Sequence, residues 1–212
     1  SAALQNAQMT ARTRGCVAVI GCALNIVNCG RLELSLNGAQ ATLLTLFSAH
    51  WVHLDRTHAL MNALHWIAML WLLRIRVSRL VGLVVVLSVA VSLGWWLFEP
   101  AMGYAGLSGV LFGLFGYQCI QWLLIRDSRL LGLGGLLVAI WLMLVGSPAT
   151  PAYDFEIAVL AHGVGLTTGI VFAGVSRHLP EWSSQLRPLR DVVVPAVRSA
   201  CASPADPDRR LR

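Results

Sequence analysis

Three short stretches of the chain carry side chains that together could cleave an acyl bond. Ser108 stands in AGLSGVLFGLFG, where glycines on both sides leave its hydroxyl unobstructed. His162 stands in AHGVGLTTG, and a neutral imidazole can take a serine proton and return it to a leaving amine. His58 and Asn62 share one face of any helix, so their donors could stabilise a developing oxyanion. Neither stretch around Ser108 and His162 holds a carboxylate, so we expect a dyad rather than a triad.

The same residues also have structural interpretations. Small residues spaced as GxxxG let two membrane helices approach closely. Two such pairs occur, Gly109 with Gly113 and Gly165 with Gly169, and Gly106 extends the first of them. A histidine and an asparagine near a membrane interface often cap a helix or contact water. Packing and catalysis are compatible here, because a nucleophile can meet its base only if the two helices lie close together.

A metal site is the other chemistry that the side chains suggest. His50, His53 and Asp55 lie close in sequence, but their spacing fits no common metal pattern. The five cysteines show no CxxC spacing. We therefore expect no metal and no cofactor.

The elements that must position these residues are membrane helices. Hydrophobic residues make up 57% of the chain and charged residues 12%, about half the charged fraction of a soluble domain. The apolar runs are continuous rather than alternating, which favours helices over a β-barrel. The fold expected is all-α, a polytopic membrane bundle of six transmembrane helices at residues 15–30, 59–73, 80–98, 105–125, 130–146 and 157–175. No small-residue cleavage site follows the first, so we interpret it as a retained helix rather than a signal peptide.

Arginine placement predicts the orientation of the bundle. All sixteen basic residues are arginine, and they cluster before the first helix and after the second, fourth and sixth. Such clusters face the cytoplasm, so both termini are expected there. The net charge of +6 therefore indicates contact with lipid rather than nucleic acid. The domains predicted are a cytoplasmic segment at 1–14, a membrane domain at 15–177 and a disordered cytoplasmic tail at 178–212.

This orientation puts the reactive residues in one layer. Ser108, His162, His58 and Asn62 all fall near the outer ends of their helices, at the periplasmic face of a bacterial inner membrane. Five tryptophans are expected at the interface or against lipid, namely Trp51, Trp66, Trp71, Trp95 and Trp96.

The motifs, in this order and on these helices, resemble the rhomboid intramembrane serine proteases. The resemblance rests on HxxxN from His58 to Asn62, GxSG from Gly106 to Gly109, and AHxxGLxxG from Ala161 to Gly169. It implies that Ser108 is the nucleophile and His162 the base, while His58, Asn62 and the Ser108 backbone N–H form the oxyanion hole. It also implies that the fifth helix controls lateral access of substrates, which would be single-pass membrane proteins in the bilayer.

The chain departs from the family pattern in two places. No Trp-Arg pair occurs in the first outer loop, and the aromatic residue that follows GxSG is Phe112, which lacks a hydroxyl. The missing pair and the run HWVHLDRTHALMNAL resemble the rhombosortase branch, which is associated with proteins that carry a C-terminal Gly-Gly, hydrophobic-helix and basic sorting tail. The alternatives are a catalytically inactive rhomboid-like binder or chaperone of membrane proteins, and a transporter that uses His58 and His162 as a proton relay.

Overall fold

The computed structural model describes residues 11–36, 41–73, 75–99, 103–145, 159–176 and 178. Its longer helices are α2 (Ala11–Val27), α4 (Arg56–Leu72), α5 (Val77–Phe98), α6 (Ser108–Leu124), α7 (Arg129–Val145) and α8 (Val159–Ser176). Shorter helical segments are η1 (Leu32–Leu34), α3 (Leu43–Ser48), η3 (Ala49–Trp51) and η4 (Arg126–Ser128). The described residues form no strand, so the all-α prediction is confirmed for them. The predicted segment 1–14 is described only from Ala11, and the predicted tail only at His178.

Each of the six predicted segments overlaps one of the longer helices. By length and composition, α5 and α8 could each cross a membrane, and α6 and α7 are shorter apolar helices. The bounds differ from the predicted ones by up to four residues, and α6 begins at Ser108 rather than near Ala105. The reason is local, because Gly106 has a φ of +130°, which lies outside the helical region.

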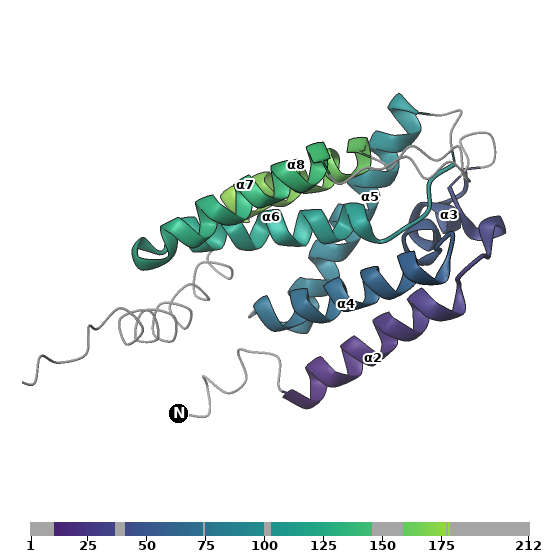
Figure 1. Ribbon diagram of the computed structural model, residues 1–212, viewed down its shortest axis with the longest axis horizontal. Helices are drawn as coiled ribbons and strands as arrows, with labels where there is room; N and C mark the ends of the chain where they lie inside the picture. Colours follow the sequence, from purple (N-terminus) through teal and green to yellow (C-terminus); the bar gives the residue numbers. More distant parts are fainter. Residues whose placement is uncertain are drawn as a thin grey trace, which may run out of the picture.

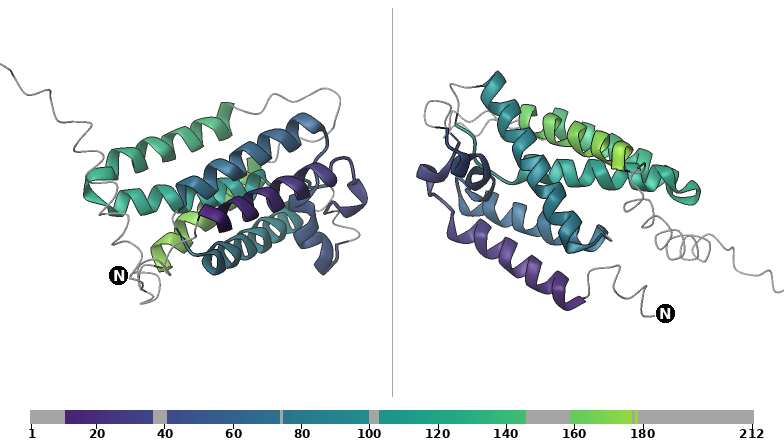
Figure 2. Two further views of the ribbon diagram at one scale, coloured as in Figure 1. Left: turned by 90° about the horizontal axis from the view of Figure 1, so that it is seen from below. Right: turned by 180° about the vertical axis from the view of Figure 1, so that it is seen from behind.

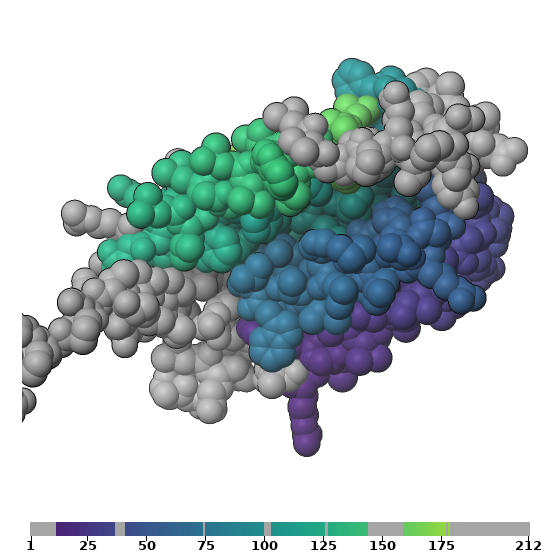
Figure 3. Space-filling model, in the orientation of Figure 1, coloured from purple at the N-terminus to yellow at the C-terminus, as the bar shows by residue number. Residues whose placement is uncertain are grey.

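Helix α6 is the centre of the bundle. It contacts α4, α5, α7 and α8, whereas α2 packs on the far side of α4. Figure 1 shows α2 and α4 side by side below α6, with α7 and α8 above it. The two views of Figure 2 show the same order, with α5 crossing the bundle. On the face seen in Figure 3, α4 and α7 form separate ridges.

The contact between α6 and α8 is made through glycine. A Cβ added at Gly165 would collide with the carbonyl oxygen of Gly109, and one at Gly169 would collide with that of Gly113. In the other direction, a Cβ at Gly109 would lie 3.0 Å from the Ala161 carbonyl oxygen. The backbones of α6 and α8 therefore touch directly, at a separation that no larger residue would permit.

The main core lies between α4, α5 and α6. It includes Leu70, Leu83, Leu87, Val110 and Leu114, each at most 1% exposed.

The prediction for the five tryptophans is partly wrong. Trp66 and Trp95 are each only 4% exposed, whereas Trp71 and Trp96 are exposed. Trp66 is buried because it fills the space above Gly21 of α2, where any Cβ would collide with the indole ring. Its Nε1 also donates to the Val17 carbonyl, at 3.3 Å. This tryptophan therefore joins α2 to α4 instead of facing lipid.

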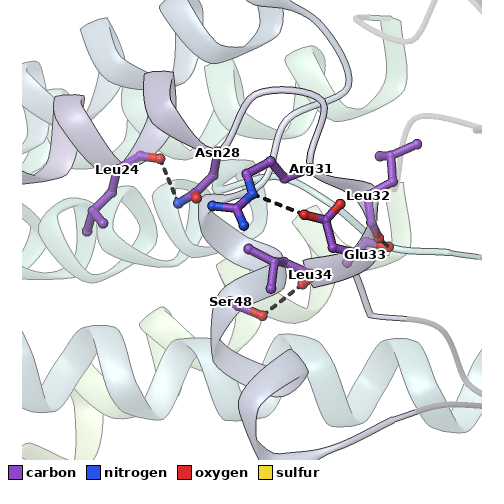
Figure 4. Close-up of polar contacts among 8 residues, drawn as sticks. Leu24, Asn28, Arg31, Leu32, Glu33, Leu34 and Ser48 are labelled. Carbon is purple, nitrogen blue, oxygen red and sulfur yellow. Dashed lines mark hydrogen bonds and ion pairs between the residues drawn. The ribbon is translucent and has the colours of Figure 1, made fainter.

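The first loop, between α2 and α4, is ordered by its own polar contacts. Arg31 pairs with Glu33 at 3.0 Å, and the Ser48 hydroxyl donates to the Leu34 carbonyl at 2.8 Å, as Figure 4 shows. Leu36 then pairs with Tyr104 through both main-chain hydrogen bonds, at 3.0 and 2.8 Å. This pairing ties the first loop to the segment that leads into α6.

Candidate active site

Ser108 is the first residue of α6, at the point where an extended segment turns into the helix. The turn requires glycine, since Gly106 has positive φ and a Cβ there would lie 3.0 Å from Cε1 of His58. Main-chain amides in the first turn of a helix have no partner within the helix, and they carry the positive end of its dipole. The Ser108 hydroxyl thus lies beside groups suited to hold an oxyanion.

His162 lies opposite Ser108 as the fourth residue of α8 and is 9% exposed. Its Nε2 is 2.8 Å from the Ser108 Oγ, within hydrogen-bond distance. The imidazole is stacked on the ring of Phe112, with centroids 4.4 Å apart and an interplanar angle of 16°. Phe112 stands one turn after Ser108, so α6 supplies both the hydroxyl and the surface against which the imidazole rests.

His58 approaches the turn before Ser108 from α4, and Asn62 lies on the same helix. The Asp55 carboxylate caps α4 by accepting the His58 backbone N–H, at 2.8 Å. The His58 ring lies next to Gly106, and Asn62 is one turn further along the helix and 4% exposed. Among the described residues, the Asn62 side-chain NH2 has no hydrogen-bond partner. A buried donor left in this state can bind an acceptor that arrives with a substrate.

The structure therefore brings the predicted residues to the amino-terminal ends of α4, α6 and α8. The glycines predicted to pack at the site lie on the α6–α8 contact, apart from Gly106, which forms the turn before Ser108. His50 and His53, considered above for a metal site, are both fully buried in the first loop. No cluster of three potential metal ligands occurs among the described residues.

Sequence reasoning missed a second Ser–His pair. His50 Nε2 lies 3.0 Å from the Ser92 Oγ and 3.0 Å from the Ser88 carbonyl oxygen, and all of these groups are buried. Ser92 in turn donates to the Leu46 carbonyl, at 2.7 Å. The one signal in the sequence was Ser88 and Ser92 at i,i+4 in an apolar helix.

The hydrogen bonds of this second pair are those of a structural contact. The Ser88 carbonyl oxygen can only accept, so His50 Nε2 carries a hydrogen and donates it to that oxygen. A protonated Nε2 cannot also take a proton from the Ser92 hydroxyl. Burial lowers the pKa of His50 to about 4, so the ring is neutral. Tyr104, whose hydroxyl lies 3.4 Å from His50 Nδ1, donates to the Gly106 carbonyl at 2.6 Å. The pair thus anchors the turn before Ser108.

Comparison with protein families gives a match over most of the described chain. The family model described as the Rhomboid domain matches residues 40–178, more than half of the chain. The match includes α3 to α8 and the residues Ser108, His162, His58 and Asn62, whereas α2 lies outside it. No curated protein matches the chain.

Proposed function

The chain belongs to the rhomboid family, and we propose that it is an intramembrane serine protease with Ser108 as nucleophile and His162 as base. Membership of the family makes it an integral membrane protein with a polytopic helical bundle. The observation that supports the proposal best is the 2.8 Å hydrogen bond between His162 Nε2 and Ser108 Oγ, at the amino-terminal end of α6. A nucleophile and its base need this separation.

The proposed reaction is acyl transfer followed by hydrolysis. Ser108 Oγ forms a bond to the carbonyl carbon of the scissile peptide while its proton passes to His162 Nε2. The carbonyl oxygen becomes an oxyanion, held by His58, Asn62 and the Ser108 backbone N–H. The C–N bond then breaks as His162 returns the proton to the amine. Water attacks the acyl-enzyme by the same route in reverse, and the acid product leaves with Ser108 restored.

We also propose how the site meets its substrate. The six longer helices would each cross the membrane, with both termini in the cytoplasm and the site near the outer face of a bacterial inner membrane. Single-pass substrates would arrive through the bilayer. Segments with helix-destabilising residues are favoured, because a regular helix keeps its carbonyls hydrogen-bonded.

The substrate class proposed is that of the rhombosortase branch, proteins with a C-terminal Gly-Gly, hydrophobic-helix and basic tail. Its support is the run HWVHLDRTHALMNAL and the first loop without a Trp-Arg pair. A panel that pairs such a tail with a generic rhomboid substrate tests it. Cleavage of the generic substrate alone would leave the mechanism standing and reject the branch.

The decisive experiment compares serines in one chain. Purified protein in proteoliposomes is assayed for cleavage and for labelling by a fluorophosphonate, which reacts with activated serines. We expect Ser108→Ala and His162→Ala to abolish both cleavage and labelling, and Ser78→Ala, an exposed position on α5, to change neither.

Ser92→Ala is a second control, because it removes the hydroxyl of the buried His50–Ser92 pair. It should keep turnover while lowering stability. Cleavage that persists in Ser108→Ala would reject the proposal, and labelling without cleavage of any substrate would favour a binding protein.

A further inference from the structure

A fully buried histidine lies directly behind His58. The ring of His53 packs edge-on against that of His58, with centroids 4.9 Å apart and an interplanar angle of 80°. On its other side, His58 borders Gly106, which precedes the Ser108 turn. Viewed outward from the nucleophile, the order is Ser108, His58 and then His53. The ring of His53 is therefore in contact with a proposed oxyanion donor.

The backbone of His53 is held by the segment that follows α2. Gly30 donates its N–H to the His53 carbonyl, at 2.7 Å, and Cys29 pairs with His53 in an isolated bridge. Gly30 adopts this position with a φ of +79°, which other residues adopt only with strain. The ring itself lies near the main-chain carbonyls of Asn25 and Trp51. A segment outside the region matched by the family model thus fixes this histidine.

The His53 ring is neutral, and it contacts the site by van der Waals packing against His58. Its side chain has no exposed surface, and although the carbonyls of Asn25 and Trp51 lie near the ring, neither ring nitrogen meets a described residue in hydrogen-bond geometry. Burial, and then the nearby His58, lower the pKa of His53 to about 4. A buried ring without hydrogen bonds can be exchanged for an apolar ring of similar shape at little cost. The His53 ring therefore gives His58 a flat surface to pack against.

We propose that His53 is a positioning residue for His58, and that the segment following α2 holds it in place. The His53 ring limits rotation of the His58 imidazole and keeps the His58 N–H donor directed at the turn before Ser108. This inference rests on the proposed function, since it assigns His58 to the oxyanion. The segment following α2, which lies outside the family match, would then affect the reaction without touching the substrate.

The test measures kcat and KM separately for two variants of His53. His53→Phe keeps a flat ring, and His53→Leu keeps apolar volume without one. We expect Phe to retain kcat, and Leu to lower kcat roughly tenfold with little change in KM, because a misdirected oxyanion donor stabilises the transition state less. His65→Leu is the control, since His65 is exposed on α4 and its ring bonds the Met61 carbonyl of the same helix.

The role of the segment after α2 is tested with a pair of glycines. Gly30→Ala strains the turn that holds His53 and should lower kcat in the same way as His53→Leu. Gly15→Ala, a position on α2 with open space around it, should not. Thermal unfolding of every variant separates lost catalysis from lost folding.

Two results would overturn the inference. If His53→Phe loses as much kcat as His53→Leu, the ring nitrogens matter and shape does not. If His53→Leu loses no more than His65→Leu, His53 has no part in the reaction. Both readings require that Ser108→Ala be inactive; a Ser108→Ala variant that still cleaves would reject the proposed function instead.

Discussion

At the scale of single residues, the site depends on side chains whose orientation is fixed by a neighbour. His162 rests on Phe112, and the turn before Ser108 is held by Tyr104 and His50. In each case the supporting residue fixes the position of a reactive group but takes no part in the reaction itself. Mutations of the supports should therefore change the rate or the stability without removing the reaction.

Phe112→Ala removes the surface on which the His162 imidazole is stacked. Such a stack is worth about 1 kcal/mol, so we expect kcat to fall roughly fivefold with KM little changed. Phe112→Tyr keeps the ring and should retain the full rate. Steady-state cleavage in proteoliposomes measures both, and an equal loss in the two variants would show that the stack is not what matters.

His50 and His53 predict how stability depends on pH. Burial lowers the pKa of each to about 4, whereas the unfolded chain has the ordinary value of 6.5. Between these values the unfolded state binds more protons, so the free energy of unfolding is highest above pH 6.5 and falls as the pH drops toward 4. The loss is about 1.4 kcal/mol per pH unit for each histidine.

Thermal unfolding in detergent between pH 7 and 5 measures this dependence. His50→Gln should make it shallower, whereas His65→Gln, which changes an exposed histidine, should leave it as in the parent. Equal slopes in all three proteins would show that buried His50 does not control acid stability.

At the scale of elements, the α6–α8 contact sets the geometry of the site. Gly165→Ala would push a methyl group into the Gly109 carbonyl and force the helices that carry Ser108 and His162 apart. We expect a loss of about 2–3 kcal/mol in the free energy of unfolding, the usual cost of overpacking, together with loss of fluorophosphonate labelling. Gly174→Ala on the same helix has open space around it and should do neither. If labelling survives in Gly165→Ala, the close approach of the backbones is not needed.

The sequence predicts the helices well and the loops poorly, for a physical reason. Continuous apolar runs determine the six longer helices, and motif spacing identifies Ser108, His162, His58 and Asn62 as residues to examine. The start of α6 differs from the prediction because Gly106 has a φ of +130°, and the segment before it is held by pairing of Tyr104 with Leu36, far away in the chain. The contacts between His50 and Ser92, and between His53 and His58, likewise depend on how loops fold over helices, which no local pattern encodes.

At the scale of the whole molecule, one end of the bundle holds the reactive groups. The amino-terminal ends of α4, α6 and α8 meet there, beside the first loop, while α7 begins at the opposite end. If the arginine pattern sets the orientation, the first loop faces outward and the start of α7 faces the cytoplasm.

Cysteine accessibility in intact cells tests this arrangement. In a cysteine-free background, Leu43→Cys in the first loop and Leu130→Cys at the start of α7 both place a thiol at an exposed position. We expect a membrane-impermeant maleimide to modify the first in intact spheroplasts and the second only after permeabilisation. The opposite pattern would reverse the predicted orientation and move the site to the cytoplasmic face.

The two main-chain hydrogen bonds between Leu36 and Tyr104 should also slow hydrogen exchange in this part of the chain. Outer loops usually exchange their amide hydrogens fast, because local openings expose them. Here three amides, those of Leu36, Tyr104 and Gly106, are bonded to main-chain carbonyls in other segments, Gly106 to Ala49 at 2.9 Å. Their deuterium uptake should be as slow as that of the helices, so the turn that carries the nucleophile would open only when the bundle does.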